Sequence, residues 1–336
     1  MAENSKIEWT DHTFNPWMGC TAISPACDHC YAEAQTARFK QVGWGAHAPR
    51  KRTRAANWNK PLQWNAKAAK LGIRQKVFCA SLADVFDNHA SIDESWRQDL
   101  WDLICDTPCL DWLLLTKRPQ NYAKFLPADW GNGYPNVWLG VTVENQTEAD
   151  RRIPILLNTP AAKRFLSCEP LLEKVIVSLV SLGPGKYPGA RVVGDTIEPL
   201  AGQIVRGTAT GYDFQPCPKI DWVICGGESG LHARPMHPDW ARSLRDQCQA
   251  AGVPFFFKQW GEWGDFTNAP HTAGLVEDRV ILPEGGVVGG GHPKYGGLVT
   301  DDWKERGAAW MCRVGKKQSG HLLDGQEWRQ FPEGDA

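Results

Sequence analysis

The stretch Asn15-Pro16-Trp17-Met18-Gly19-Cys20, followed by Cys27 and Cys30, is the part of the sequence around which the fold can be worked out. Its three cysteines have the spacing C-x6-C-x2-C and lie in a loop rich in Gly, Pro and Ser. A helix is predicted directly after them, over residues 31–39. Two cysteines separated by two residues can place both sulfurs on one metal, and the longer arm can fold a third sulfur over it. The pattern therefore predicts a metal site at Cys20, Cys27 and Cys30.

Three kinds of site are compatible with this spacing. Three thiolates satisfy three irons of a [4Fe–4S] cluster and leave the fourth iron open for another ligand. A structural zinc site needs a fourth protein ligand, and His29 lies between the paired cysteines, where it would point away from their metal. Zinc would therefore require a distant Cys or His. A redox pair of Cys27 and Cys30 would leave Cys20 without a role.

Length and composition set the frame for these alternatives. The chain has 336 residues and a formal net charge of −1, so no global basic field indicates a nucleic-acid partner. This length suffices for one large α/β barrel with appendages, or for two domains. The sequence holds 11 cysteines, an odd number, and shows no signal peptide and no apolar run of membrane-spanning length. We therefore expect a cytoplasmic protein in a reducing compartment.

Short apolar runs alternate with helix-like stretches after residue 76, and polar or glycine residues follow each run. Continuous apolar runs of this kind are typical of buried parallel strands joined by crossover helices. The residues that follow the predicted strands are Ser81, Asp84 and Asp87; Thr116, Lys117 and Arg118; Thr142, Glu144 and Asn145; Cys168 and Glu169; Gly226, Gly227, Glu228 and Ser229; and Lys258, Gln259 and Gly261.

The predicted fold class is α/β, a partial or complete TIM-like β/α barrel. Such a barrel builds its active site at the carboxyl ends of its strands. An open doubly wound sheet would also place ligands there, but about seven strands without an early G-x-G-x-x-G favour the barrel. We assign residues 1–261 to the barrel, with a basic, Trp-rich segment at 40–70 and an insertion at 173–220. Residues 262–336 are predicted to leave the barrel and form a small β-rich C-terminal cap.

The basic, Trp-rich segment has a composition that suits nucleic acid. Cations can pair with phosphates, and tryptophans can stack on bases. A solvated, charged loop that covers the barrel explains the same residues equally well. The candidate binding side chains of this segment are Trp44, Arg50, Lys51, Arg52, Arg54 and Trp58.

The cysteine loop carries a family resemblance. Asn15-Pro16-x-x-Gly19-Cys20 with Cys27-x2-Cys30 is similar to the cluster loop of radical S-adenosylmethionine (SAM) enzymes, and among them it resembles spore photoproduct lyase and its relatives. Over nearly the whole chain the sequence resembles a family of phage and prophage proteins with a radical-SAM-like barrel (DUF5131). The motifs that carry this resemblance are residues 50–64, Leu166-Ser167-x-Glu169-Pro170-Leu171-Leu172, Gly226-Gly227-Glu228-Ser229-Gly230, 255–261 and 315–325. The first cysteine gap is six residues, where the common radical-SAM spacing has three.

The resemblance implies a mechanism and a set of partners. Cys20, Cys27 and Cys30 would hold a [4Fe–4S] cluster, SAM would chelate its fourth iron, and an electron donor such as flavodoxin or ferredoxin would reduce it. The product would be a 5′-deoxyadenosyl radical, used for modification or repair of a nucleic acid or nucleotide in a phage-infected or prophage-carrying bacterial host. The alternative is a non-catalytic nucleic-acid-binding protein with structural zinc.

The resemblance also assigns roles at the strand ends. Lys117 would be the best candidate to bind the methionine carboxylate of SAM, with a surface lysine at a helix start as the alternative. Ser81 and Asp84 would accept hydrogen bonds from its amino group, and Asp84 could instead cap a helix. The remaining SAM contacts would come from Thr142, Glu144 and Asn145 at the ribose and from Gly226 and Gly227 at the adenine. The side chains of Glu169, Glu228 and Lys258 would bind the substrate, or would instead form structural ion pairs.

Overall fold

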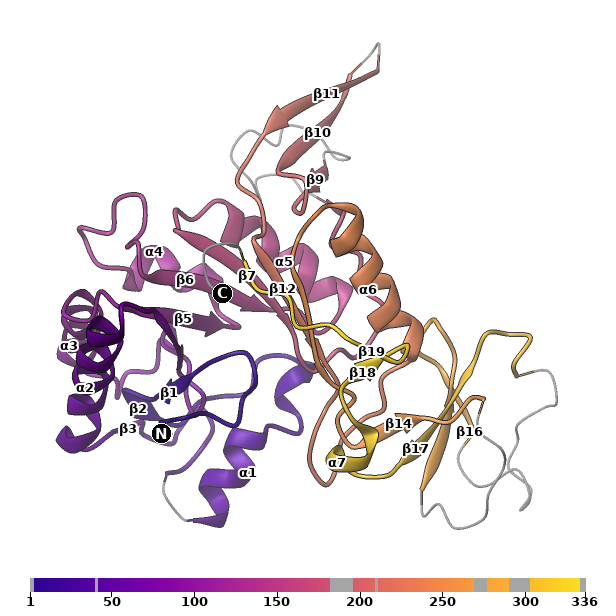
Figure 1. Ribbon diagram of the computed structural model, residues 1–336, viewed down its shortest axis with the longest axis horizontal. Coiled ribbons are helices and arrows are strands. Elements are labelled where there is room, and N and C mark those ends of the chain that lie inside the picture. The colour runs from indigo at the N-terminus through magenta and orange to yellow at the C-terminus, as the bar shows by residue number, and fades with distance from the viewer. Residues whose placement is uncertain are drawn as a thin grey trace.

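A seven-stranded parallel sheet forms the centre of the protein in the computed structural model, which describes residues 3–39, 42–181, 196–208, 211–268, 277–289 and 303–332. The sheet is curled into a half-barrel (Figure 1). Its strands follow one another in chain order and every pairing is parallel. They are β1 (His12–Phe14), β4 (Gln75–Cys79), β5 (Leu110–Thr116), β6 (Val137–Thr142), β7 (Lys163–Cys168), β12 (Trp222–Gly226) and β13 (Phe255–Gln259).

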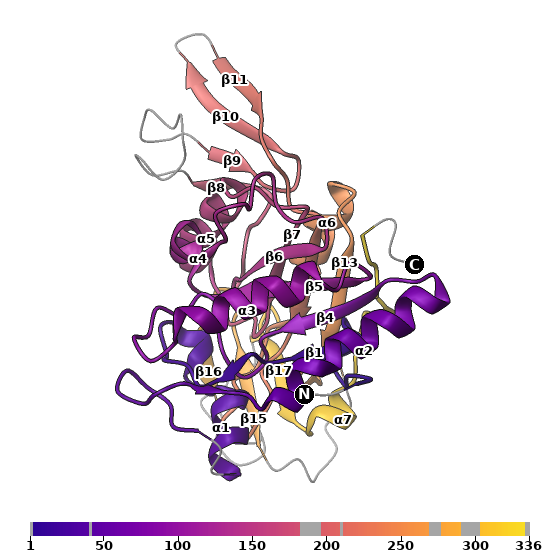
Figure 2. The same cartoon turned by 90° about the vertical axis from the view of Figure 1, so that its left-hand side faces the viewer.

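This strand order decides between the two predicted architectures. A doubly wound sheet reverses its order at a switch point, and here the order never reverses. The prediction of a partial β/α barrel is therefore confirmed at this level. The helices that join the strands pack on the outer face (Figures 1 and 2) and enclose the main hydrophobic core. They include α2 (Ala55–Leu71), α3 (Glu94–Cys105), α4 (Tyr122–Phe125), α5 (Gln146–Leu157) and α6 (Pro238–Ala250).

The inner face of the half-barrel is filled by a separate cluster of large side chains. Successive residues of a strand point to opposite faces, so Phe78 lies inside while Val77 and Cys79 belong to the outer core. Gly140 makes room for this filling, because a Cβ there would lie 2.3 Å from the ring of Phe165. The inner cluster consists of Trp9, Phe78, Leu113, Trp138, Phe165, Trp222, Ile224 and Phe256.

Two antiparallel sheets are attached to the half-barrel. The first is inserted between β7 and β12 and projects from one end of the molecule (Figure 1). Its order is β11-β10-β9-β8, from β8 (Val180–Ser181), β9 (Thr196–Glu198), β10 (Gln203–Thr208) and β11 (Gly211–Pro216). The second follows β13, with the order β14-β17-β15-β16, from β14 (Trp263–Asp265), β15 (Asp278–Ile281), β16 (Val287–Gly289) and β17 (Ala309–Arg313).

Short elements complete the described chain. The cysteine loop contains a 3-10 turn, η1 (Pro25–Cys27), and leads into α1 (Tyr31–Arg38). A second 3-10 turn, η2 (Pro119–Asn121), follows β5. The other short elements are β2 (Trp17–Met18), β3 (Lys51–Arg52), α7 (Lys316–Ser319), β18 (Leu322–Leu323) and β19 (Gln326–Glu327). None of the described helices is both long and apolar enough to span a membrane.

The sequence suggested that residues 262–336 leave the barrel. In the structure the end of this segment returns to it. The backbone N–H of Phe257 in β13 donates to the carbonyl of Trp328 at 2.8 Å. The indole of Trp222 donates to the carbonyl of Gln330 at 2.8 Å, and its ring lies 5.2 Å from that of Phe331. An uncovered edge strand exposes unpaired backbone groups, so this returning segment protects the outer edge of β13.

The close approach of Phe165 to Gly140 gives a stability prediction. Gly140→Ala should destabilise the fold by about 1–3 kcal/mol, because it adds a carbon to a filled interior. Urea denaturation measures the loss. In a Phe165→Leu background, which removes the ring, the same substitution should cost clearly less. An equal cost in both backgrounds would show that the Phe165 ring is not what excludes the added carbon.

Candidate functional site

A cavity of about 370 Å³ opens at the carboxyl ends of the parallel strands. This volume lies within the roughly 300–1,000 Å³ of ordinary small-molecule sites. Its wall includes the cysteine loop, residues that follow β4, β5, β7 and β12, and the last two residues of β13. The predicted site residues that line it are Cys20, Cys27, Cys30, Trp44, Ser81, Asp84, Lys117, Thr142, Glu169, Gly227, Glu228 and Lys258.

Cys20 has the closest polar contacts of the three cysteines. A guanidinium N–H of Arg118 (Nη1) donates to its Sγ at 3.4 Å, and the thiol lies 3.7 Å from the carbonyl of Thr21. Burial raises the pKa of Cys20 to about 11, and the charge of Arg118 opposes that rise. Since a metal binds the thiolate, the Arg118 cation favours the form of Cys20 that a metal requires.

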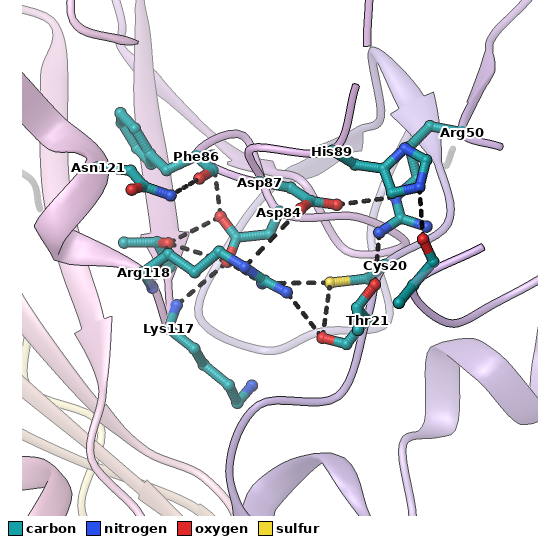
Figure 3. A network of polar contacts seen from close by, with 12 residues as sticks. Cys20, Thr21, Arg50, Asp84, Phe86, Asp87, His89, Lys117, Arg118 and Asn121 are labelled. Carbon is teal, nitrogen blue, oxygen red and sulfur yellow. Dashed lines mark hydrogen bonds and ion pairs between the residues drawn. The ribbon is translucent and has the colours of Figure 1, made fainter. Parts of the chain in front are cut away.

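The Asp84 carboxylate holds Arg118 in place and accepts hydrogen bonds from several other groups of the protein (Figure 3). Its carboxylate accepts hydrogen bonds from the Thr116 hydroxyl at 2.7 Å, from the Phe86 N–H at 2.9 Å and from Arg118 Nη1 at 3.0 Å. The backbone N–H of Lys117 adds a fourth, at 3.3 Å. A carboxylate with this many donors has little capacity left for the SAM amino group. The predicted SAM contact of Asp84 therefore does not fit the structure.

Arg50 braces the same loop from the other side (Figure 3). Its Nε donates to Asp87 at 2.7 Å and one terminal nitrogen donates to the Thr21 hydroxyl at 2.7 Å. Its other terminal nitrogen donates to the carbonyls of Gly45 and Ala48. The side chain is buried, so the predicted contact between Arg50 and a phosphate does not fit its position.

Two further residues of the basic segment, Arg52 and Trp58, have partners within the protein. Arg52 pairs with Asp99 at 2.5 Å, and its guanidinium carbon lies 4.6 Å from the centre of the Trp58 ring. Trp58 packs edge-on against Phe14, which does not fit a base-stacking role. Arg54 is exposed at the start of α2 and lies outside the lining of the cavity.

Glu144 and Asn145 have structural partners. Glu144 is buried and pairs with Arg152 at 2.7 Å, while its other oxygen accepts from the backbone N–H of Ala26 in the cysteine loop at 3.4 Å. The Asn145 side chain accepts from the N–H of Glu148 and so caps α5. The predicted ribose contacts of both residues do not match these positions.

Close contacts within the protein account for both Gly226 and Gly227. A Cβ on Gly227 would lie 1.9 Å from the carbonyl oxygen of Trp260, and one on Gly226 would lie 2.8 Å from a carboxylate oxygen of Glu169. The glycines therefore allow two strand ends to meet. Of the two, Gly227 lines the cavity and Gly226 does not, so the predicted approach to adenine has no structural counterpart at Gly226.

Lys117 differs from its neighbours in the direction of its side chain. It extends away from the Asp84 carboxylate (Figure 3) and lines the cavity. Among the described residues no carboxylate is within ion-pair distance of its amine. Ser81 lies on the same wall, where its hydroxyl accepts from the Asn15 amide at 3.0 Å. Lys117 is thus placed to bind an anionic group inside the cavity.

The wall that contains the ends of β7, β12 and β13 carries two ion pairs. Glu169 pairs with Lys258 at 3.0 Å and accepts from the Trp9 indole at 3.2 Å. Glu228 pairs with Arg234 at 2.6 Å and lies 3.1 Å from the His29 ring nitrogen. Structural ion pairs at both glutamates were one of the two alternatives that the sequence left open, and the structure contains them.

Arg234 is a site residue that the sequence analysis missed. Besides Glu228, it contacts Asp28 at 3.2 Å and donates to the carbonyl of Pro25 at 2.8 Å. It therefore ties the cysteine loop to the segment after β12. The available signal was an arginine six residues after a glutamate at a strand end, which does not by itself reveal a contact with a loop 200 residues earlier.

The comparisons with known proteins identify the family. The family described as "Protein of unknown function (DUF5131)" matches residues 4–332. The chain belongs to this family. The comparison with curated proteins found no match.

Two solved structures of spore photoproduct lyase are similar to the chain at 12% identity. One is a double mutant with bound AdoMet and dinucleoside spore photoproduct, with a TM-score of 0.38 over 75% of each chain. The other is a single mutant, with a TM-score of 0.37 over 74% of each chain.

The ion pair of Glu228 gives a pH prediction. Burial raises the pKa of Glu228, but the hydrogen bonds from Arg234 and His29 outweigh burial and hold this pKa below its ordinary value. The stabilisation is therefore present above the ordinary pKa and is lost as the pH falls through the lowered one. Glu228→Gln should flatten the acid side of the unfolding free energy plotted against pH. Glu284→Gln, at an exposed glutamate, should leave the profile unchanged, and identical profiles for both variants would contradict the prediction.

Proposed function

We propose that this chain is a radical SAM enzyme in which Cys20, Cys27 and Cys30 hold a [4Fe–4S] cluster and SAM binds beside it. The observation that carries the proposal is the shared cavity. Three thiols line one cavity at the carboxyl ends of a parallel half-barrel, together with Lys117, which has no ion-pair partner among the described residues. Thiolates are the ligands of iron–sulfur clusters, and a cation that lines the cavity suits the carboxylate of an amino-acid-like cofactor.

A cluster and a single zinc ion place different demands on the three thiols. In the part of the chain that the structure describes, no three Cys, His, Asp or Glu side chains converge as ligands of one metal ion. A zinc ion needs its ligands at about 2.0–2.3 Å from one point. A four-iron cluster takes each cysteine on a different iron, so its ligands stand further apart around a larger body.

The bound cluster and SAM would supply a 5′-deoxyadenosyl radical, which is the chemistry of the cofactors. The chain's own residues position and protect it. Lys117 would bind the carboxylate of SAM. The apolar side chains Ile7, Trp9, Phe78 and Leu115 line the same cavity and would keep water away from a reactive carbon centre.

The cysteine assignment predicts the metal content of variants. Anaerobic reconstitution with iron and sulfide should load the wild type, whereas Cys20→Ala, Cys27→Ala and Cys30→Ala should each lose iron and acid-labile sulfide. Cys105→Ala is the control, because Cys105 is exposed and lies outside the lining of the cavity. A variant of the three that keeps the full iron and sulfide content would remove that cysteine from the ligand set.

The proposed role of Lys117 predicts that its loss weakens the binding of SAM. Loss of a charged hydrogen bond costs about 1.5–3 kcal/mol, so Lys117→Ala should weaken SAM binding by roughly 10- to 150-fold at unchanged iron content. Anaerobic calorimetry measures the dissociation constant. Lys124→Ala, at an exposed lysine of α4 outside the cavity lining, is the matched control. Equal affinities in both variants would exclude Lys117 from SAM binding.

A further inference from the structure

We propose that Arg118 is a positioning residue for the cluster, which fixes Cys20 and raises the reduction potential of the bound iron–sulfur group. The proposal rests on the proposed function of the same site. Arg118 follows β5, which ends at Thr116, and lies almost 100 residues after Cys20, so its contact with the sulfur exists only in the folded protein.

The contact has two parts on the cysteine loop. Arg118 Nη1 donates to the Cys20 Sγ at 3.4 Å, and Nη2 donates to the carbonyl of Thr21 at 2.7 Å (Figure 3). A planar guanidinium that makes both bonds fixes the direction of the sulfur relative to the backbone after it. Arg118 is 4% exposed, so both bonds form where water competes little.

The other side of the guanidinium is fixed by acids. Nη1 also donates to Asp84 at 3.0 Å, and Nε lies 3.8 Å from Asp87. Asp84 in turn is held by the Thr116 hydroxyl at 2.7 Å. Arg118 is therefore oriented before any cluster binds, in the way that outer-shell groups orient metal ligands.

This geometry has a consequence for redox chemistry. Hydrogen bonds to the sulfurs and nearby charge set the potential of an iron–sulfur cluster. Reduction adds a negative charge to it, and a buried cation that donates to one of its sulfurs stabilises the reduced form more than the oxidised form. Loss of Arg118 should therefore lower the midpoint potential and make the cluster harder to reduce.

Arg50 offers a matched control in the same network. It is buried, pairs with Asp87 at 2.7 Å and donates to the Thr21 hydroxyl at 2.7 Å. Its other bonds go to backbone carbonyls. Arg50 thus holds the same loop as Arg118 but donates only to oxygen atoms, whereas Arg118 also donates to the sulfur. A comparison of Arg50 and Arg118 variants therefore distinguishes an effect on the position of the loop from an effect on the potential of the cluster.

The experiment measures the cluster potential of the reconstituted full-length chain by an anaerobic redox titration followed by electron paramagnetic resonance. Arg118→Gln should shift the midpoint potential downward and change the spectrum of the reduced cluster. Arg118→Lys, which keeps the charge and the pair with Asp84, is the variant to use if Arg118→Gln does not fold; it should show a smaller shift of the same sign. Arg50→Gln should lower the unfolding temperature and leave the potential at its wild-type value.

Each contrary result has a separate meaning. A wild type that takes up no cluster would overturn the proposed function and this inference together. A loaded wild type whose potential is unchanged in both Arg118 variants would overturn the inference alone. A shift in Arg50→Gln as large as that in Arg118→Gln would assign the effect to bracing of the loop, and would also overturn it.

Discussion

The buried ion pairs of Arg118 with Asp84 and of Arg50 with Asp87 are the constraint on which the site depends. A buried charge without a partner is costly, so each arginine is held inside by its own carboxylate. Arg118 also donates to the Cys20 sulfur and the Thr21 carbonyl, and Arg50 donates to the Thr21 hydroxyl and to two backbone carbonyls. The position of the cysteine loop over the strand ends therefore follows from the need to pair these charges.

The half-barrel supplies the other boundary of the site. Its seven strands run parallel in chain order, so their carboxyl ends meet on one side. The inner cluster of aromatic and aliphatic side chains fills the space between them, and the C-terminal segment covers the outer edge of β13. The polar residues at the strand ends therefore line one cavity together with the cysteines. Arg50 and Arg118 hold the cysteine loop at this end of the sheet.

The parallel strands, their polar ends and the presence of all three cysteines on one cavity could be predicted from the sequence, because strand periodicity and parallel topology determine them. The partners of the polar residues could not. Asp84, Glu144 and Arg50 look the same in a sequence whether they face a ligand or another part of the chain, and only packing shows that they bind Arg118, Arg152 and Asp87. Trp58 was misassigned for the same reason, since a tryptophan beside an arginine serves equally well in a core.

The central claim is that this cavity binds SAM against a reducible cluster, and SAM cleavage tests it most directly. The reconstituted wild type should convert SAM under dithionite into 5′-deoxyadenosine and methionine in equal amounts, and the Cys27→Ala variant should form neither. A wild-type chain that carries zinc without sulfide and leaves SAM intact under dithionite would contradict the account.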